Sequence, residues 1–243
     1  MIPEELLATG PSSGQVWRII ENQEQAATRR ITRSASAQSR LEQLLDQNKP
    51  KYLQGSEHLH WLLKTPFRYP PLAHGSRFGS PFEPGILYAA RELHTAMTES
   101  AVYLWLFRAA LQDPGPLDRI SDGRTAIHFP VRHDQFSDLT KAREYRHQIS
   151  DPASYRFSQG LGTQLRETDA AAIWFYSARA RKGISCAVLN PEAIPTGIAP
   201  ETHHWQLQLD ATHCWWGQPG RESFEVRYQD VADIKGDIPH PAL

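Results

Sequence analysis

The chain has 243 residues, of which 40% are hydrophobic and 22% are charged, and its formal net charge is −1. A chain of this size can bury a hydrophobic core without disulfides or metals to support it. The near-zero charge gives no general attraction to nucleic acid or to anionic membranes, which counts against a nuclease. No apolar run approaches the roughly 20 residues that a membrane-spanning helix requires.

Cysteine usage and the first residues favour the reducing cytoplasm. Cys186 and Cys214 lie in different segments, which is too few for a disulfide framework and lacks the paired spacing of a zinc ribbon. The first five residues contain no basic stretch followed by an apolar run, so we expect no signal peptide. The histidines also lack the spacing of a helical zinc site, and we expect no bound metal.

The first half of the chain is expected to be mainly helical. Residues 1–14 are expected to form a flexible arm, and residues 15–243 a single domain that opens with a short strand at 15–20. A weak apolar stripe at steps of three and four predicts a long polar helix at about 23–47. Such a helix packs a narrow seam on the core or serves as a surface for a partner, such as a second copy of the chain.

Three prolines between residues 65 and 72 predict that this segment is not a regular helix. The next expected elements are a buried strand at 85–89, an amphipathic helix at 92–108, a strand at 124–131, a short helix capped by Ser137, and a helix from Asp151 to about residue 167.

Strands are expected to dominate the second half, at 171–176, 184–189, 204–210 and 222–228. Within the third of these, apolar and polar residues alternate, as in a half-buried strand. Helices first and strands later favour an α+β fold over a doubly wound α/β fold. No Gly-x-Gly-x-x-Gly motif opens a βαβ unit, so a bound dinucleotide would not occupy a Rossmann site.

The segment 65–99 contains the side chains needed to hold a dinucleotide and to break its glycosidic bond. Arg77 follows a Gly-Ser turn, where its guanidinium can hold a phosphate through two parallel hydrogen bonds. The alternative is a surface arginine in a salt bridge. Tyr88 lies in an apolar run. It is either a ring that stacks on nicotinamide or a core tyrosine with its hydroxyl hydrogen-bonded.

Glu99 lies about two turns into the helix expected at 92–108, on the face that carries apolar residues. A carboxylate on an apolar face requires a partner. Glu99 either meets a basic side chain or accepts a hydrogen bond from a ribose. In the second case it would stabilise the positive charge that develops on the ribose as the glycosidic bond breaks.

Three further residues are candidates. Arg18, on the strand expected at 15–20, is either a second phosphate ligand or an exposed edge-strand residue, and Arg68 is a third basic candidate. Ser177 ends the strand expected at 171–176. Its hydroxyl would donate to a ligand, hold Glu99 in place, or satisfy the backbone of a turn.

The order of Arg77, Glu99 and Ser177 resembles that of the RES domain family, which takes its name from arginine, glutamate and serine. The resemblance covers about residues 16–227 and is densest over 65–99. It implies a fold like that of ADP-ribosyltransferases, with two small antiparallel sheets around a cleft and helices at the sides. It also implies a site in which Glu99, Arg77 and Tyr88 are catalytic and Arg18, Arg77, Tyr88 and Ser177 bind NAD.

The resemblance further implies a cytoplasmic toxin of a toxin–antitoxin pair, which degrades NAD by cleaving the nicotinamide–ribose bond. Water and inorganic phosphate remain open as acceptors, and NAD is a substrate rather than a cofactor. The implied partner is an Xre-type helix-turn-helix antitoxin, with no direct contact to nucleic acid or membrane. The alternatives are an ADP-ribosyltransferase acting on a macromolecule and a binding module without chemistry. One departure is Gly79, which stands where the family often has asparagine.

Overall fold

The computed structural model describes residues 2–22, 32–110 and 115–241 of the chain. Its strands are β1 (Gly10–Glu21), β2 (Leu87–Ala90), β3 (Ile120–Asp138), β4 (Ala172–Tyr176), β5 (Ile184–Val188), β6 (Glu201–Leu209), β7 (His213–Gly217) and β8 (Phe224–Arg227). These described strands form one eight-stranded sheet in the order β1-β2-β5-β4-β3-β6-β7-β8, and β1 also pairs with β3.

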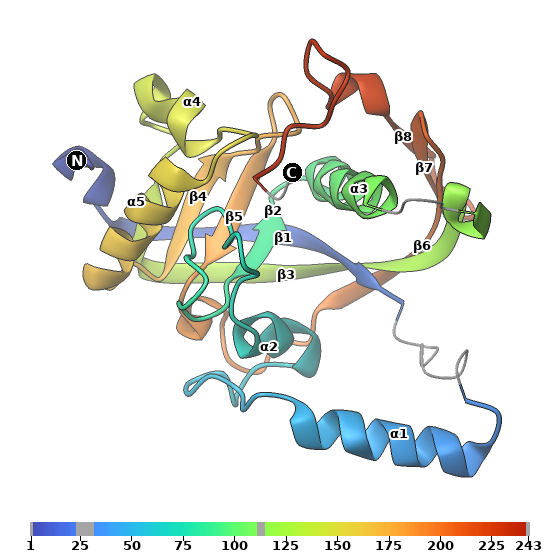
Figure 1. Cartoon of the computed structure of the whole chain (residues 1–243). Coiled ribbons are helices and arrows are strands. Elements are labelled where there is room, and N and C mark those ends of the chain that lie inside the picture. Colours follow the sequence, from blue (N-terminus) through green and yellow to red (C-terminus); the bar gives the residue numbers. More distant parts are fainter. Residues whose placement is uncertain (1, 23–31, 111–114, 242–243) are drawn as a thin grey trace.

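The two long strands, β1 and β3, form an antiparallel ladder in which Ser12 lies opposite His133 and Glu21 lies opposite Arg124. Strand β4 pairs in parallel with β3 at 136–138, at one end of the ladder, and β6 pairs with residues 120–128 toward the other end, whereas β2 pairs with β1 at Trp17, opposite His128. The ladder therefore carries two wings, β2-β5-β4 and β6-β7-β8 (Figure 1). The α+β class is confirmed, and the two sheets implied by the resemblance are joined as wings of one mixed sheet.

Helices flank this sheet. They are α1 (Ala35–Asn48), α2 (Trp61–Arg68), α3 (Leu93–Ala109), α4 (Arg146–Ile149) and α5 (Arg156–Glu167), with 3₁₀ turns at Glu4–Leu7, Gly115–Asp118, Arg143–Tyr145, Pro191–Ala193 and Tyr228–Asp230. Helix α3 contacts β1, β2, β5 and β8, so it lies over the sheet between the two wings, whereas α1 lies at the outer edge (Figure 1). No helix among the described residues has the length and apolar character required to cross a bilayer.

Three apolar clusters hold these elements together. Leu63 and Phe67 of α2 pack under the first wing with Trp174. Trp105 of α3 packs with Trp216 and the rest of the second wing. The third cluster joins α5 to the opposite face of the first wing and includes Phe78, Leu161, Leu165 and Phe175. Because α3 has its own apolar partners, its position over the sheet is fixed independently of any ligand.

The expectation of a flexible arm at residues 1–14 is wrong for the residues that the structure describes. Leu6 is buried in the core, and β1 already begins at Gly10. The register of the ladder shifts between Gly10 and Ser12, which leaves Pro11, a residue without an N–H group, outside the regular pairing. The Gly- and Pro-rich composition therefore marks a bulge in a strand rather than a loose end.

Two expected helices differ from the structure. The helix expected at 23–47 is present from Ala35 to Asn48, residues 32–34 are not helical, and residues 23–31 lie outside the described residues. The proline-rich segment does contain a helix, α2, with Pro66 inside it. Burial of its Leu63 and Phe67 against the sheet compensates for the one backbone hydrogen bond that a proline removes.

Smaller differences concern capping and one strand. Ser137 lies within β3 and caps no helix. Helix α5 begins at Arg156 rather than at Asp151, because the Asp151 carboxylate accepts N–H groups from a turn that precedes the helix. Strand β7 was not expected from the sequence, although it pairs with both β6 and β8.

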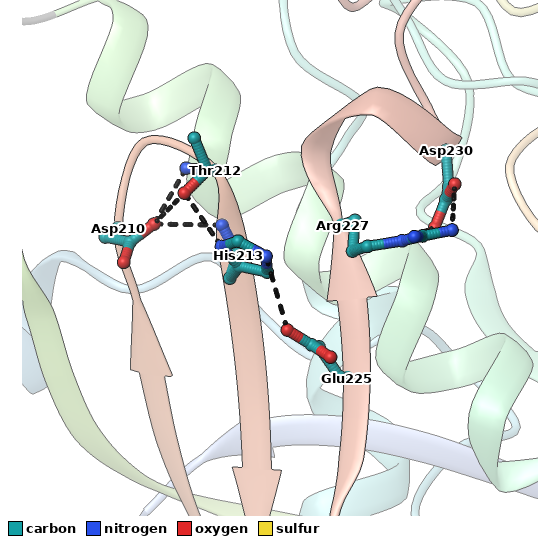
Figure 2. Close-up of polar contacts among 6 residues, drawn as sticks. All are labelled: Asp210, Thr212, His213, Glu225, Arg227 and Asp230. Carbon is teal, nitrogen blue, oxygen red and sulfur yellow. Dashed lines mark hydrogen bonds and ion pairs between the residues drawn. The ribbon is translucent and has the colours of Figure 1, made fainter.

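A hydrogen-bonded turn connects β6 to β7, as Figure 2 shows. The Asp210 carboxylate accepts the Thr212 N–H at 2.7 Å, the Thr212 hydroxyl at 2.9 Å and the His213 N–H at 2.9 Å. These hydrogen bonds hold the pKa of Asp210 below its ordinary value. In the same view, Asp230 makes an exposed two-point ion pair with Arg227, at 2.9 and 3.0 Å.

We predict that Asp210→Ala lowers the free energy of unfolding at pH 7 by about 1 kcal/mol, because three donors lose their acceptor. Since the folded-state pKa is depressed, this contribution is present at neutral pH and shrinks as the pH falls below about 4. Urea unfolding of the unmodified protein and the variant, at pH 7 and below about pH 4, measures this contribution. Asp230→Ala is the matched control and should cost less than about 0.5 kcal/mol. Equal losses in the two variants at pH 7 would contradict the prediction.

Candidate active site

A cavity of about 370 Å³ lies between α3, β1 and β2. Its wall includes Arg18 of β1, Arg77 of the loop before β2, Tyr88 of β2 and Glu99 of α3. Ser177, at the end of β4, contacts Glu99. Four of the five residues that the sequence nominates for the site therefore line one cavity and the fifth contacts Glu99, although they come from two strands, a helix, a loop and the residue that follows β4. Their chemical roles stay predictions.

Glu99 is held by Ser177. The Ser177 hydroxyl lies 2.5 Å from Glu99 Oε1, and it also accepts the N–H groups of Arg179 at 3.0 Å and Ala180 at 2.8 Å. Because two N–H donors already point at the Ser177 oxygen, its single hydrogen is directed toward the carboxylate. The half-buried Glu99 side chain is thus held in one orientation at the cavity wall.

Arg77 is presented by a tight turn. The backbone of Ser76 pairs with that of Gly79 in both directions, at 2.7 and 3.3 Å, so Arg77 lies at the tip. Gly75 has a φ of +76°, and a Cβ there would lie 2.1 Å from the Gln159 amide nitrogen. Gln159 itself donates to the Ser76 carbonyl at 3.1 Å. Glycine is required at this position because both the backbone angle and the space exclude a side chain.

The Arg77 guanidinium is buried and is held by groups that carry no charge. Its Nη1 donates to the carbonyl oxygens of Ile149 at 3.1 Å and Asp151 at 2.9 Å. The guanidinium also lies over the Tyr155 ring, 4.8 Å from the ring centre. No carboxylate of the described residues pairs with it. The salt-bridged surface arginine considered from the sequence is therefore not what the structure contains.

Tyr88 has the hydrogen-bonded hydroxyl considered from the sequence, whereas stacking of its ring on nicotinamide stays a prediction. Its hydroxyl accepts the Phe78 N–H and donates to the Ser76 hydroxyl, each at 3.0 Å, which fastens the Arg77 turn to β2. Burial raises the pKa of Tyr88 to about 12, so the hydroxyl stays protonated at neutral pH. The side chain also lines the cavity, where its ring is available to a flat ligand.

Arg18 is a second cation at the cavity, and its side chain is half-buried. Its Nη1 donates to the Tyr88 carbonyl at 2.6 Å, and its Nε is buried without a partner in the described part of the chain. Burial lowers the pKa of Arg18 to about 10, so the group remains charged at neutral pH. A half-buried cation that lacks an acidic partner is destabilising to the extent that it is shielded from water. An anionic ligand in the cavity would relieve that cost.

Among the residues of the cavity wall that sequence reasoning missed are Arg179, Tyr155 and His240. Arg179 follows Ser177 by two residues, and that proximity was the one signal available.

Arg68, a candidate from the sequence, lies outside the cavity, where it donates to the Pro50 carbonyl and lies over the Tyr52 ring. Among the described residues, no group of three or more histidine, cysteine or acidic side chains is placed to hold a metal ion.

Comparison with known proteins assigns the chain to a family. The RES domain model matches residues 53–210, and the protein belongs to the RES domain family. No curated protein matches the sequence. The crystal structure of the M. tuberculosis MbcT–MbcA toxin–antitoxin complex contains a similar chain, with 14% identity, a TM-score of 0.47, and coverage of 86% of this chain and 93% of that chain. Similarity at that level does not bear on activity.

We predict that Arg18→Met weakens the binding of inorganic pyrophosphate about tenfold, because a charged donor is lost from the cavity. The free energy of unfolding should stay level or rise slightly, since a half-buried charge without an acidic partner is removed. Calorimetric titration and urea unfolding measure the two quantities. Arg124→Met is the control, because Arg124 pairs with Glu21 and Asp122 outside the cavity and should affect only stability. Unchanged pyrophosphate binding in Arg18→Met would contradict the prediction.

Proposed function

We propose that this RES domain protein cleaves the nicotinamide–ribose bond of NAD. The observation that carries the proposal is the placement of Glu99. This carboxylate, oriented by Ser177, faces the same cavity as two guanidinium groups that lack acidic partners in the described residues. A diphosphate requires cations, and a ribose that develops positive charge requires an anion. Both kinds of group line the one cavity, as a dinucleotide would need.

In the proposed reaction, Arg18 and Arg77 hold the diphosphate, and the Tyr88 ring stacks on the nicotinamide. Glu99 accepts a hydrogen bond from a hydroxyl of the nicotinamide-side ribose. As the glycosidic bond breaks, its electron pair leaves with the nicotinamide, which becomes neutral, and positive charge develops on the ribose. Glu99 stabilises that charge more strongly than it stabilises the ground state, which lowers the barrier. A water oxygen then bonds to the ribose carbon and releases a proton to solvent, or an oxygen of an inorganic phosphate anion bonds to that carbon instead.

Membership of the RES domain family supports a wider proposal about the biological role. Destruction of NAD would make the protein a toxin, and its partner would be an antitoxin, for which we propose the Xre helix-turn-helix type. An antitoxin that covers the cavity would stop NAD from entering. The proposed site of action is the cytoplasm, where NAD is available as the substrate.

Incubation of the purified protein with NAD, with and without phosphate, tests the activity directly. We expect nicotinamide together with free ADP-ribose, or with its phosphorylated form when phosphate is the acceptor. Mass spectrometry distinguishes these products. If label from NAD instead remains on protein or nucleic acid, the ADP-ribosyltransferase alternative replaces the proposal. If NAD is left intact, the chain is a binding module.

We predict that Glu99→Gln lowers kcat by about a hundredfold to a thousandfold, because the charge is lost. The amide oxygen of glutamine still accepts from Ser177, so the fold and the melting temperature should be preserved. Glu92→Gln is the control, since Glu92 precedes α3, accepts from Thr95 and the Ile184 N–H, and does not line the cavity. Turnover within tenfold of the unmodified protein in Glu99→Gln would remove Glu99 from this role.

A further inference from the structure

The last described residues of the chain return to the cavity. Ile238 is buried in the apolar cluster beneath α3, and His240 is buried and lines the cavity wall. In Figure 1 the last described part of the chain runs back toward α3. This segment lies outside residues 53–210, which match the family model. Its contacts are therefore a property of this chain that family membership does not supply.

The segment holds Arg179 through the backbone. Arg179 Nη2 donates to the Pro239 carbonyl at 2.7 Å and to the Pro152 carbonyl at 3.1 Å. Its Nη1 is buried without a partner among the described residues. Because the side chain lines the cavity, the unsatisfied donor is available to a ligand there. Pro239 thus fixes the direction of a guanidinium that has an unused donor.

The segment also supports Arg77, through one intermediate. The His240 Nε2 lies 3.1 Å from the Tyr155 hydroxyl, and the Tyr155 ring lies beneath the Arg77 guanidinium, 4.8 Å from its carbon. His74 and Tyr103 pack edge-on against the His240 ring, each with ring centres 5.5 Å apart. The His240 ring is therefore held on several sides, and it in turn fixes the position of Tyr155.

These contacts orient the two cations without neutralising them. Carbonyl oxygens and an aromatic ring are uncharged partners, so the positive charge of Arg77 and Arg179 stays available to a ligand. Burial, together with Arg179, His74 and Arg77, lowers the pKa of His240 to about 4. His240 is consequently neutral at physiological pH and adds no repulsion. Two like charges held close together favour a dianionic ligand over a monoanionic one.

We propose that Pro239 and His240 are positioning residues, which aim Arg179 and Arg77 at one diphosphate group in the cavity. The assignment of that diphosphate to NAD rests on the proposed function, whereas the anion site itself does not. The alternative is that the segment blocks the cavity, in which case loss of its contacts would strengthen ligand binding. If the segment positions the two arginines, loss of its contacts weakens ligand binding.

His240→Ala, His240→Gln and Tyr155→Phe are compared with the unmodified protein, and His213→Ala is the control. His213 is an exposed histidine on β7 that pairs with Glu225 (Figure 2). Calorimetric titration with inorganic pyrophosphate and with ADP-ribose gives affinity. Steady-state kinetics with NAD separate KM from kcat, and near-ultraviolet circular dichroism reports folding.

We expect His240→Ala to weaken both ligands about tenfold and to raise KM about as much, with kcat changed less than threefold. His240→Gln should restore most of the affinity, because its amide can meet the Tyr155 hydroxyl. Tyr155→Phe keeps the ring beneath Arg77 but loses that hydroxyl, so it should reproduce the His240→Ala effect. The double variant should be no weaker than either single variant, because both break the same contact.

Unchanged or tighter pyrophosphate binding in His240→Ala would overturn the proposal. So would additive effects of His240→Ala and Tyr155→Phe, or an unmodified protein that binds neither probe. If His240→Ala does not fold, His240→Gln and Tyr155→Phe decide the matter by the same titrations. Failure of the unmodified protein to consume NAD, together with tight pyrophosphate binding that these variants weaken, would refute only the proposed function.

Discussion

The antiparallel ladder between β1 and β3 is the constraint on which the rest of the structure depends. Both wings of the sheet are hydrogen-bonded to these two strands, and α3 can lie between the wings only because the ladder fixes their separation. The ladder also positions the residues of the site. Arg18 belongs to β1, Tyr88 belongs to β2, which pairs with β1, and Ser177 follows β4, which pairs with β3. The cavity is thus a product of the long-range strand pairing.

Within the cavity, the charged groups are oriented mainly by neutral partners. Carbonyl oxygens bind Arg18, Arg77 and Arg179, and a hydroxyl binds Glu99. Neutral partners of this kind orient the charged side chains without cancelling their charges. The negative potential at Glu99 and the positive potential at the guanidinium groups are therefore retained. If each cation were paired with its own carboxylate, the charged groups would be easier to bury. The cations would then attract an anionic ligand only weakly.

Local sequence signals predicted α3 within one residue at each end and most of the strands, because apolar periodicity and burial agree there. They also nominated Arg77, Glu99 and Ser177, because each stands beside a turn or on an apolar face. They failed where tertiary contacts decide. Helix α2 tolerates Pro66 because Phe67 is buried, and the first residues are ordered by pairing with β3. Nothing near His240 in the sequence indicates that it lines the cavity and contacts Tyr155.

The cavity joins Arg18, near the beginning of the chain, to His240, which is among the last residues described. During translation, β1 and α3 leave the ribosome well before His240, and domains fold as their parts become available. A nascent or prematurely terminated chain would therefore lack the segment that aims two of the guanidinium groups. For a protein proposed to destroy NAD, this order of assembly delays full ligand affinity until His240 has been synthesised.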